Sequence, residues 1–177
     1  MPSCIDNLRR ILHQSSITEV SGQGVAILKE TDPSNSYEIE LKGLPPDSLI
    51  VKIERFKEKR YFLNGRHGIA RRADFAIVND DALVFIELKS GKFQRTVVKR
   101  QLRGAQCVMD YCASIGNRFF NDPNFLNPAI NNPHLVLLHT GRSMNKRRSI
   151  AEKNQSSNHP FKMIKCGSSV YYRELLS

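Results

Sequence analysis

Two apolar runs lie near the middle of the chain, at residues 73–78 and 82–88, with a short acidic turn between them. Short apolar runs bounded by turn residues are typical of buried strands. The sequence therefore predicts a β-hairpin, closed by a two-residue turn at Asp80 and Asp81 or by a four-residue loop around them. The second run is apolar on both faces before Glu87, which is the pattern of a central strand.

On either side of the hairpin, the spacing of apolar residues predicts helices and further strands. Apolar residues spaced three and four apart predict a helix over residues 96–115 and a shorter one over 6–13. The order of elements predicts a single α/β domain over residues 1–177, with a mixed central sheet of about five strands and helices on both sides. The other strands are expected at 37–41, where the alternation suggests an edge strand, and at 49–56, 134–140, 161–164 and 170–172.

Charge adds a candidate partner, because 27 Lys and Arg residues outnumber 17 Asp and Glu residues and give a formal net charge of +10. Such a surplus favours polyanions, and nucleic acid first among them. No apolar run approaches the ~18–20 residues of a membrane span, and the start of the chain lacks the order of a secretion signal. The four cysteines form no CxxC pair, so we expect reduced thiols in a cytoplasmic protein without membrane contact.

The predicted hairpin carries ionic residues that its register brings together. Either form of the turn puts Asp74 directly opposite Glu87, where Cβ atoms lie about 4.5–5.5 Å apart. The two-residue period puts Lys89 on the same face as Glu87. Opposed like charges destabilise a sheet, and a divalent cation would offset the repulsion, since Mg²⁺ is held by one or two carboxylates plus substrate phosphates. The backbone carbonyl of Leu88 would supply a further ligand.

A simpler explanation is that both acids lie on a solvated face, with Lys89 paired to one of them. Central strands rarely admit ionic residues without a reason, which favours the metal site. The chain also repeats the tripeptide as Glu40-Leu41-Lys42, in the alternating strand where an ordinary solvated face is expected. The two copies of one tripeptide therefore have different expected roles.

Asp74, the tripeptide Glu87-Leu88-Lys89 and a following helix that opens with Arg100-Gln101-Leu102 together resemble the PD-(D/E)XK nuclease superfamily. This superfamily includes restriction endonucleases and Holliday-junction resolvases. The resemblance covers residues 71–115, and it implies a restriction-endonuclease-like fold and the cleavage of phosphodiester bonds.

Carried over by position, the resemblance implies an enzyme that depends on Mg²⁺, with Mn²⁺ as a substitute. Asp74 and Glu87 would bind the metal together with the carbonyl of Leu88. Lys89 would position or polarise the attacking water and stabilise the charge that develops on the phosphate, and Gln101 would assist.

The chain departs from the family pattern at two places. Ala73 stands where the family name has Pro, and the Gln-x-x-x-Tyr motif of the exonuclease branch is absent. Many members also add an upstream acidic ligand. We choose Glu54 for this role, because it is nearer in sequence than the other candidates, Glu19 and Glu38.

Basic clusters flank the proposed site, and there they would contact substrate phosphates. A charge run is usually a solvated face, but its position beside the acids favours binding. The most polar segment, residues 142–160, is also basic, and we expect a mobile loop, a solvated helix or a surface that binds a polyanion. The residues expected to bind nucleic acid are Arg66, His67, Arg71, Arg72, Lys92 and Arg95.

The expected substrate is DNA rather than RNA. Cleavage of both strands by a chain of this size usually takes two sites, which implies a homodimer, and a 177-residue chain without a recognition domain would take its specificity from a protein partner. The alternative is a catalytically inactive module that binds nucleic acid or protein on the same fold, although intact Asp, Glu and Lys residues argue against a decayed site. A third interpretation is a regulatory protein whose charge serves solubility or membrane contact.

Overall fold

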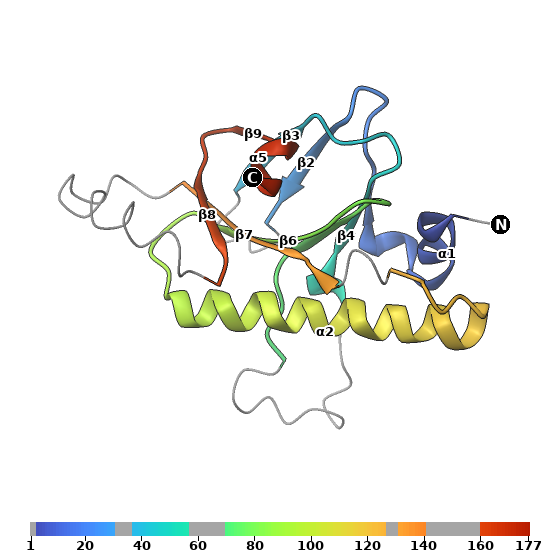
Figure 1. Cartoon of the computed structure of the whole chain (residues 1–177). Helices are drawn as coiled ribbons and strands as arrows, with labels where there is room; N and C mark the ends of the chain where they lie inside the picture. The colour runs from blue at the N-terminus through green and yellow to red at the C-terminus, as the bar shows by residue number, and fades with distance from the viewer. Residues whose placement is uncertain (1–2, 31–36, 57–69, 127–130, 141–159) are drawn as a thin grey trace.

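The chain folds into two β-sheets and a long helix. Figure 1 shows this helix, α2, beneath the larger sheet, with the smaller sheet above it. A computed structural model of the chain describes residues 3–30, 37–56, 70–126, 131–140 and 160–177.

The larger sheet has six strands in the order β1-β4-β5-β6-β7-β8. The pairs from β1 to β6 are antiparallel, and β6, β7 and β8 run parallel to one another. This arrangement confirms an α/β fold with a mixed sheet, with six strands instead of about five. The strands are β1 (Ile17–Thr18), β4 (Leu49–Lys52), β5 (Phe75–Val78), β6 (Leu83–Lys89), β7 (His134–His139) and β8 (Lys162–Lys165).

The central hairpin has the predicted register. Val78 pairs with Leu83 and Phe75 pairs with Ile86. The loop between the strands is closed by the side chain of Asn79, whose Oδ1 accepts hydrogen bonds from the amides of Asp81 and Ala82. Strand β6 is buried from Leu83 to Leu88 and is paired on both sides, so the prediction of a central strand is confirmed.

Helix α2 (Arg95–Phe120) covers one face of the larger sheet. Its buried stripe, which includes Leu102 and Met109, packs against Ala76 and Phe85 of the hairpin. The N-terminal helix α1 (Cys4–Ile11) joins the same core, next to the C-terminal half of α2 in Figure 1. Burial of these apolar side chains, at about 25 cal/mol per Å², is the main force that holds the helix on the sheet.

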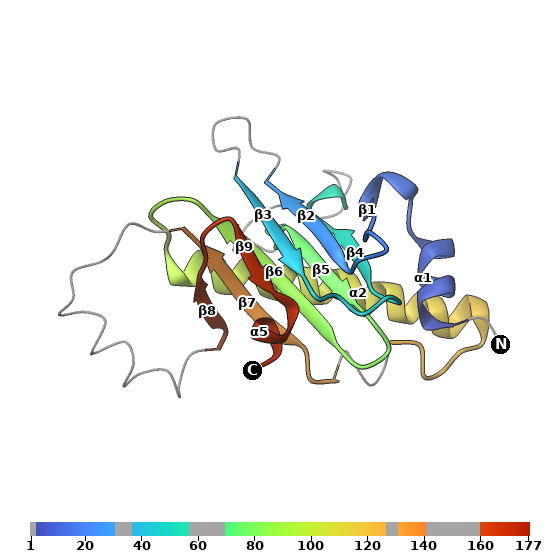
Figure 2. The ribbon, with the colours of Figure 1, turned by 90° about the horizontal axis from the view of Figure 1, so that it is seen from above.

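The opposite face is covered mainly by the three-stranded sheet β2-β3-β9, which lies over β5 and β6 in Figure 2. Leu28 and Leu41 of this sheet pack against Ile77 and Ile86. Of the helices in the described ranges, the short helix α5 lies on this face, so helices occur on both sides of the sheet, although strands make up most of the cover here. The elements are β2 (Val25–Lys29), β3 (Glu38–Lys42), β9 (Ser169–Tyr171) and α5 (Tyr172–Leu176).

Several predicted boundaries change. The strand expected at 49–56 ends at Lys52 and continues as the 3₁₀ turn η2 (Ile53–Arg55), which the Phe56 amide closes by donating to the carbonyl of Ile53. Strand β3 lies in the middle of its sheet, not at an edge. The strand expected at 170–172 gives way to helix α5 at Tyr172. A second 3₁₀ turn, η1, covers Gln14–Ser16.

Three other predictions concern the basic segment, the cysteines and a membrane span. Only Pro160 of the basic segment 142–160 is among the described residues, so the prediction of a mobile segment lies outside them. All four cysteines are free. Of the helices in the described ranges, none is both long and apolar enough to cross a membrane.

Candidate active site

The two predicted metal ligands meet at the open end of the hairpin. Asp74 lies one residue before β5, and extending the register beyond the Phe75–Ile86 pair puts it opposite Glu87. The Asp74 Oδ2 atom accepts a hydrogen bond of 2.7 Å from the amide of Leu88. A side-chain carboxylate thus takes the amide of a buried strand as its donor, which fixes Asp74 against the backbone of β6.

Both carboxyl groups lie away from water, since Glu87 is fully buried and Asp74 is 9% exposed. Burial raises the pKa of Glu87 above its usual range, and the neighbouring Asp74 raises it further. Burial also raises the pKa of Asp74, while its bond from the Leu88 amide and the charge of Lys89 act in the opposite direction. Two adjacent carboxyls with raised pKa values favour either a bound proton or a bound cation.

Lys89 lies in the same cluster, and its Nζ atom forms an ion pair with Oε1 of Glu87. Burial lowers the pKa of Lys89, but the negative charges of Glu87, Asp74 and Glu30 outweigh burial, and the net shift is upward. The side chain is 25% exposed. A lysine with a raised pKa is positively charged at neutral pH, so it can stabilise an anion beside the two acids.

Gln101 reaches the site from helix α2. Its side-chain amide lowers the pKa of Glu87 by hydrogen bonding, and its backbone carbonyl accepts a bond of 2.9 Å from the amide of Ala73. The Gln101 Oε1 atom is buried and, among the described residues, has no hydrogen-bond partner. A buried amide oxygen without a partner can accept a hydrogen bond from a water molecule in the site.

The helix and the hairpin approach each other closely beside these residues. A Cβ atom at Gly104 would lie 1.8 Å from the carbonyl oxygen of Arg71. Only glycine allows this contact. Gly104 therefore sets the distance between α2 and the segment that leads to Asp74.

Acidic residues from two other elements also act on the site. Glu54, in the 3₁₀ turn after β4, raises the pKa of Asp74, and its choice as an upstream metal ligand stays a prediction. Glu30, at the end of β2, raises the pKa values of both Asp74 and Lys89. Sequence reasoning missed Glu30, because the strand that carries it was not predicted. The other two candidates lie elsewhere: Glu38 pairs with Lys29, and Glu19 bonds Gln14.

The donor set fits a hard divalent cation. Mg²⁺ typically takes one or two carboxylates and completes its shell with water and substrate phosphates. Asp74 and Glu87 would hold such an ion, and the carbonyl of Leu88 belongs to the same strand. Three or more His, Cys, Asp or Glu side chains in a metal-binding arrangement do not occur in the described ranges. Glu30 and Glu54 therefore influence the site as charges and are not shown as ligands.

The predicted nucleic-acid ligands fall into three groups. Lys92 is exposed between β6 and α2, and Arg95 begins α2 at the same end of the site. Arg71 is exposed, whereas the Nη1 atom of Arg72 donates a bond of 2.6 Å to the carbonyl of Phe56, and burial lowers its pKa. This contact favours a structural role for Arg72. The predictions for Arg66 and His67 lie outside the described residues.

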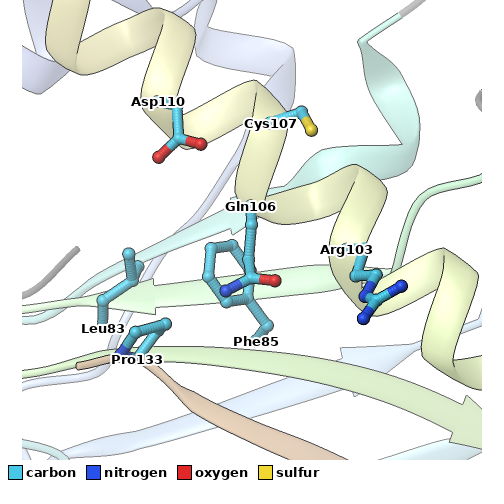
Figure 3. A pocket seen from close by; sticks show the side chains of 7 residues that line it. All are labelled: Leu83, Phe85, Arg103, Gln106, Cys107, Asp110 and Pro133. Carbon is cyan, nitrogen blue, oxygen red and sulfur yellow. The ribbon is translucent and has the colours of Figure 1, made fainter. Parts of the chain in front are cut away.

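A hollow of about 360 Å³ lies between α2 and the start of β6. Figure 3 shows the side chains that line it. Phe85, two residues before Glu87, lies on its floor, and Pro133 borders it. None of the predicted site residues lines it. The remaining lining residues are Leu83, Arg103, Gln106, Cys107 and Asp110.

The second copy of the tripeptide has the solvated setting that was expected for it. Lys42 Nζ lies 2.9 Å from Glu40 Oε2, with side-chain exposures of 36% and 44%. The corresponding glutamate in β6 is fully buried. The two copies make the same ion pair in different dielectric surroundings.

No protein-family model matches this chain, and the curated proteins and solved structures searched contain no match to it.

Proposed function

We propose that the protein is a metal-dependent nuclease that hydrolyses phosphodiester bonds, with DNA as the preferred substrate. The observation that carries this proposal is the pair of buried, adjacent carboxyls, Asp74 and Glu87, with Lys89 paired to one of them. Burial of a charged cluster costs free energy, and structural roles rarely need one in the central strand of a sheet. A site that recruits a cation and a phosphate explains this cost.

Each residue has a role that follows from its chemistry. Asp74 and Glu87 would hold Mg²⁺ or Mn²⁺, which when bound supplies a Lewis acid and lowers the pKa of water. Lys89, positively charged, would stabilise the additional negative charge on the phosphate as the water attacks. The Gln101 amide would orient that water through its buried oxygen. The surplus of basic residues, at +10, supports a polyanionic substrate.

The test is the cleavage of labelled single-stranded DNA, duplex DNA and RNA with Mg²⁺, Mn²⁺ or EDTA. Lys89→Ala and Asp74→Ala should each abolish metal-dependent cutting, with a loss of at least about 100-fold. Lys42→Ala is the matched control, because it removes the lysine of the same tripeptide from an exposed ion pair. Its activity should equal that of the wild type.

Three results would contradict the proposal. Cutting that survives both site substitutions would place the activity elsewhere. Equal losses in Lys42→Ala and Lys89→Ala would indicate a general effect of lost charge. Nucleic-acid binding without any cutting, in wild type and variants alike, would favour the alternative of an inactive binding module.

A further inference from the structure

A row of basic side chains extends from the candidate site across the larger sheet. Lys89 pairs with His139 of β7, and His139 pairs with Lys165 of β8. Residues that face each other in a sheet point to the same side. The next row inward is Glu87, Leu137 and Met163, of which Leu137 and Met163 pack into the α2 core. The basic row therefore lies on the α2 side of the sheet, at the ends of three parallel strands.

Exposure is greatest at the outer end of this row. The Lys89 side chain is 25% exposed, His139 is half-buried and Lys165 is exposed. Lys89 is paired with Glu87, while Lys165 forms no ion pair with any residue in the described parts of the chain. The row thus extends from the buried acids to the outer strand of the sheet. Lys165, at its outer end, is an exposed positive charge.

Hydrogen bonds hold the row in place up to the strand ends. The amide of Thr140 donates to the carbonyl of Lys89, at 3.2 Å, and its hydroxyl donates to the carbonyl of Ser90, at 3.1 Å. The amide of Cys166 donates to the carbonyl of His139, at 3.0 Å. The ring of Phe93 lies 5.5 Å from the ring of His139 and limits its orientation. Side chains on such a fixed backbone are positioned before a ligand arrives.

We propose that Lys89, His139 and Lys165 form a phosphate track for one nucleic-acid strand, with Lys89 at the phosphate that is cut and Lys165 at a phosphate beside it. The proposal rests on the proposed function, because it takes the acids next to Lys89 as the point of cleavage. Neighbouring strands lie about 4.8 Å apart, so the row spans about 10 Å. This length reaches from the phosphate that is cut to its near neighbours on the same strand.

The track predicts that Lys165 contributes charge-dependent affinity and that His139 contributes a hydrogen bond to phosphate, without either residue contributing to the chemistry. In EDTA, Lys165→Ala and His139→Ala should each weaken the binding of a short single-stranded DNA about three- to fivefold. Loss of the charged Lys165 contact should also lower the slope of log affinity against log salt by about 0.7, whereas His139→Ala should leave that slope unchanged. Arg118→Ala is the control, because Arg118 is exposed and lies about 35 Å along α2 from its first residue. It should leave both quantities unchanged.

Substrates with one neutral methylphosphonate identify the contact. The linkage is moved one position at a time on either side of the cleaved bond, and cleavage by wild type and Lys165→Ala is compared. Neutralising one flanking phosphate should slow the wild type but leave Lys165→Ala unaffected, and the effect should occur on one side of the cut. If each neutral linkage slowed cleavage by the wild type and by Lys165→Ala equally at every position, the track would be overturned.

The two proposals can fail separately. A wild type that cuts, while Lys165→Ala keeps the wild-type affinity and salt slope, refutes the track and leaves the nuclease standing. A wild type that binds with the predicted slopes and never cuts keeps the phosphate contacts of the row, but it refutes the nuclease and with it the placing of Lys89 at a cut phosphate. No binding of nucleic acid by the wild type refutes the track.

Discussion

The buried acids make the stability of the folded protein depend on pH. The pKa of Glu87 in the folded protein is raised by burial and by Asp74. Between the ordinary carboxyl pKa of about 4.3 and the raised value, the folded state binds more protons than the unfolded state. The free energy of unfolding therefore falls as pH rises through this window. A bound divalent cation would remove the dependence by replacing the proton.

Glu87→Gln should remove much of this loss of unfolding free energy at high pH, because glutamine has no proton to lose. In EDTA the Tm of the wild type should fall between pH 5 and pH 8, and the fall should be smaller in Glu87→Gln, by about 2–4 °C for each kcal/mol relieved. The measurement is a pair of thermal melts across this range, and Glu40→Gln is the control. Parallel pH profiles for wild type and Glu87→Gln would show that Glu87 ionises normally.

At the scale of elements, the close contact between α2 and the hairpin sets the site. Gly104→Ala would normally stabilise a helix by about 1 kcal/mol, but here its Cβ would collide with the carbonyl of Arg71. We expect the substitution to push α2 away, break the Ala73–Gln101 bond and lower cleavage. Gly22→Ala is the control, because a Cβ there meets nothing within 4 Å.

The outcome is measured as Tm together with cleavage rate. Gly104→Ala should lower both, whereas Gly22→Ala should lower neither. A Gly104→Ala protein with a higher Tm and full activity would show that the helix packs more loosely than the structure indicates.

The turn of the hairpin connects the two cores. Asn79 is buried, its Oδ1 accepts two backbone bonds, and its Nδ2 donates a bond of 2.7 Å to the hydroxyl of Tyr172 at the start of α5. Asn79→Ala leaves these partners unsatisfied and should cost about 2–3 kcal/mol. Tyr172→Phe removes one bond and should cost about 1 kcal/mol. Denaturant unfolding measures both, and equal costs would contradict the role of Asn79 as the shared anchor.

At the scale of the whole molecule, ligand binding should couple to stability. A cation that binds only the folded state raises the free energy of unfolding by about 2.7 kcal/mol at 100 times its Kd, which corresponds to a Tm increase of about 5–10 °C at this size. We expect this increase with Mg²⁺ in the wild type and its loss in Asp74→Asn. Matched ionic strength with NaCl controls for general charge screening. An equal rise in both proteins would place the cation elsewhere.

The sequence predicts the hairpin part of the site well. Asp74, Glu87 and Lys89 depend on the register of one local turn, and an apolar strand on either side of that turn determines this register. The helix that carries Gln101 is equally local, with a regular apolar stripe over several turns. Short-range periodicity is enough to place the three hairpin residues near one another. Gln101 was expected at the site only from the resemblance to a nuclease superfamily, and the packing of α2 on the hairpin brings it there.

The second sheet and the residues around the hairpin depend on contacts between distant segments, and the periodicity of the sequence does not encode such contacts. Strand β3 pairs with β9, and the Tyr37 hydroxyl donates to the carbonyl of Gly167, 130 residues away. This pairing completes the second sheet, and the packing of that sheet on the larger one brings Glu30, just after β2, to the site. The role of His139 follows from the parallel pairing of β6 and β7 in the same way.

The repeated Glu-Leu-Lys tripeptide has a consequence for enzyme design. Copying these three residues onto an exposed strand reproduces the ion pair, as Glu40 and Lys42 show, but leaves both charges in water. The copy in β6 gains its altered proton affinities from a second acid across the hairpin and from a helix that seals it. A transplanted motif would therefore need its opposing strand and its covering helix to be transferred with it.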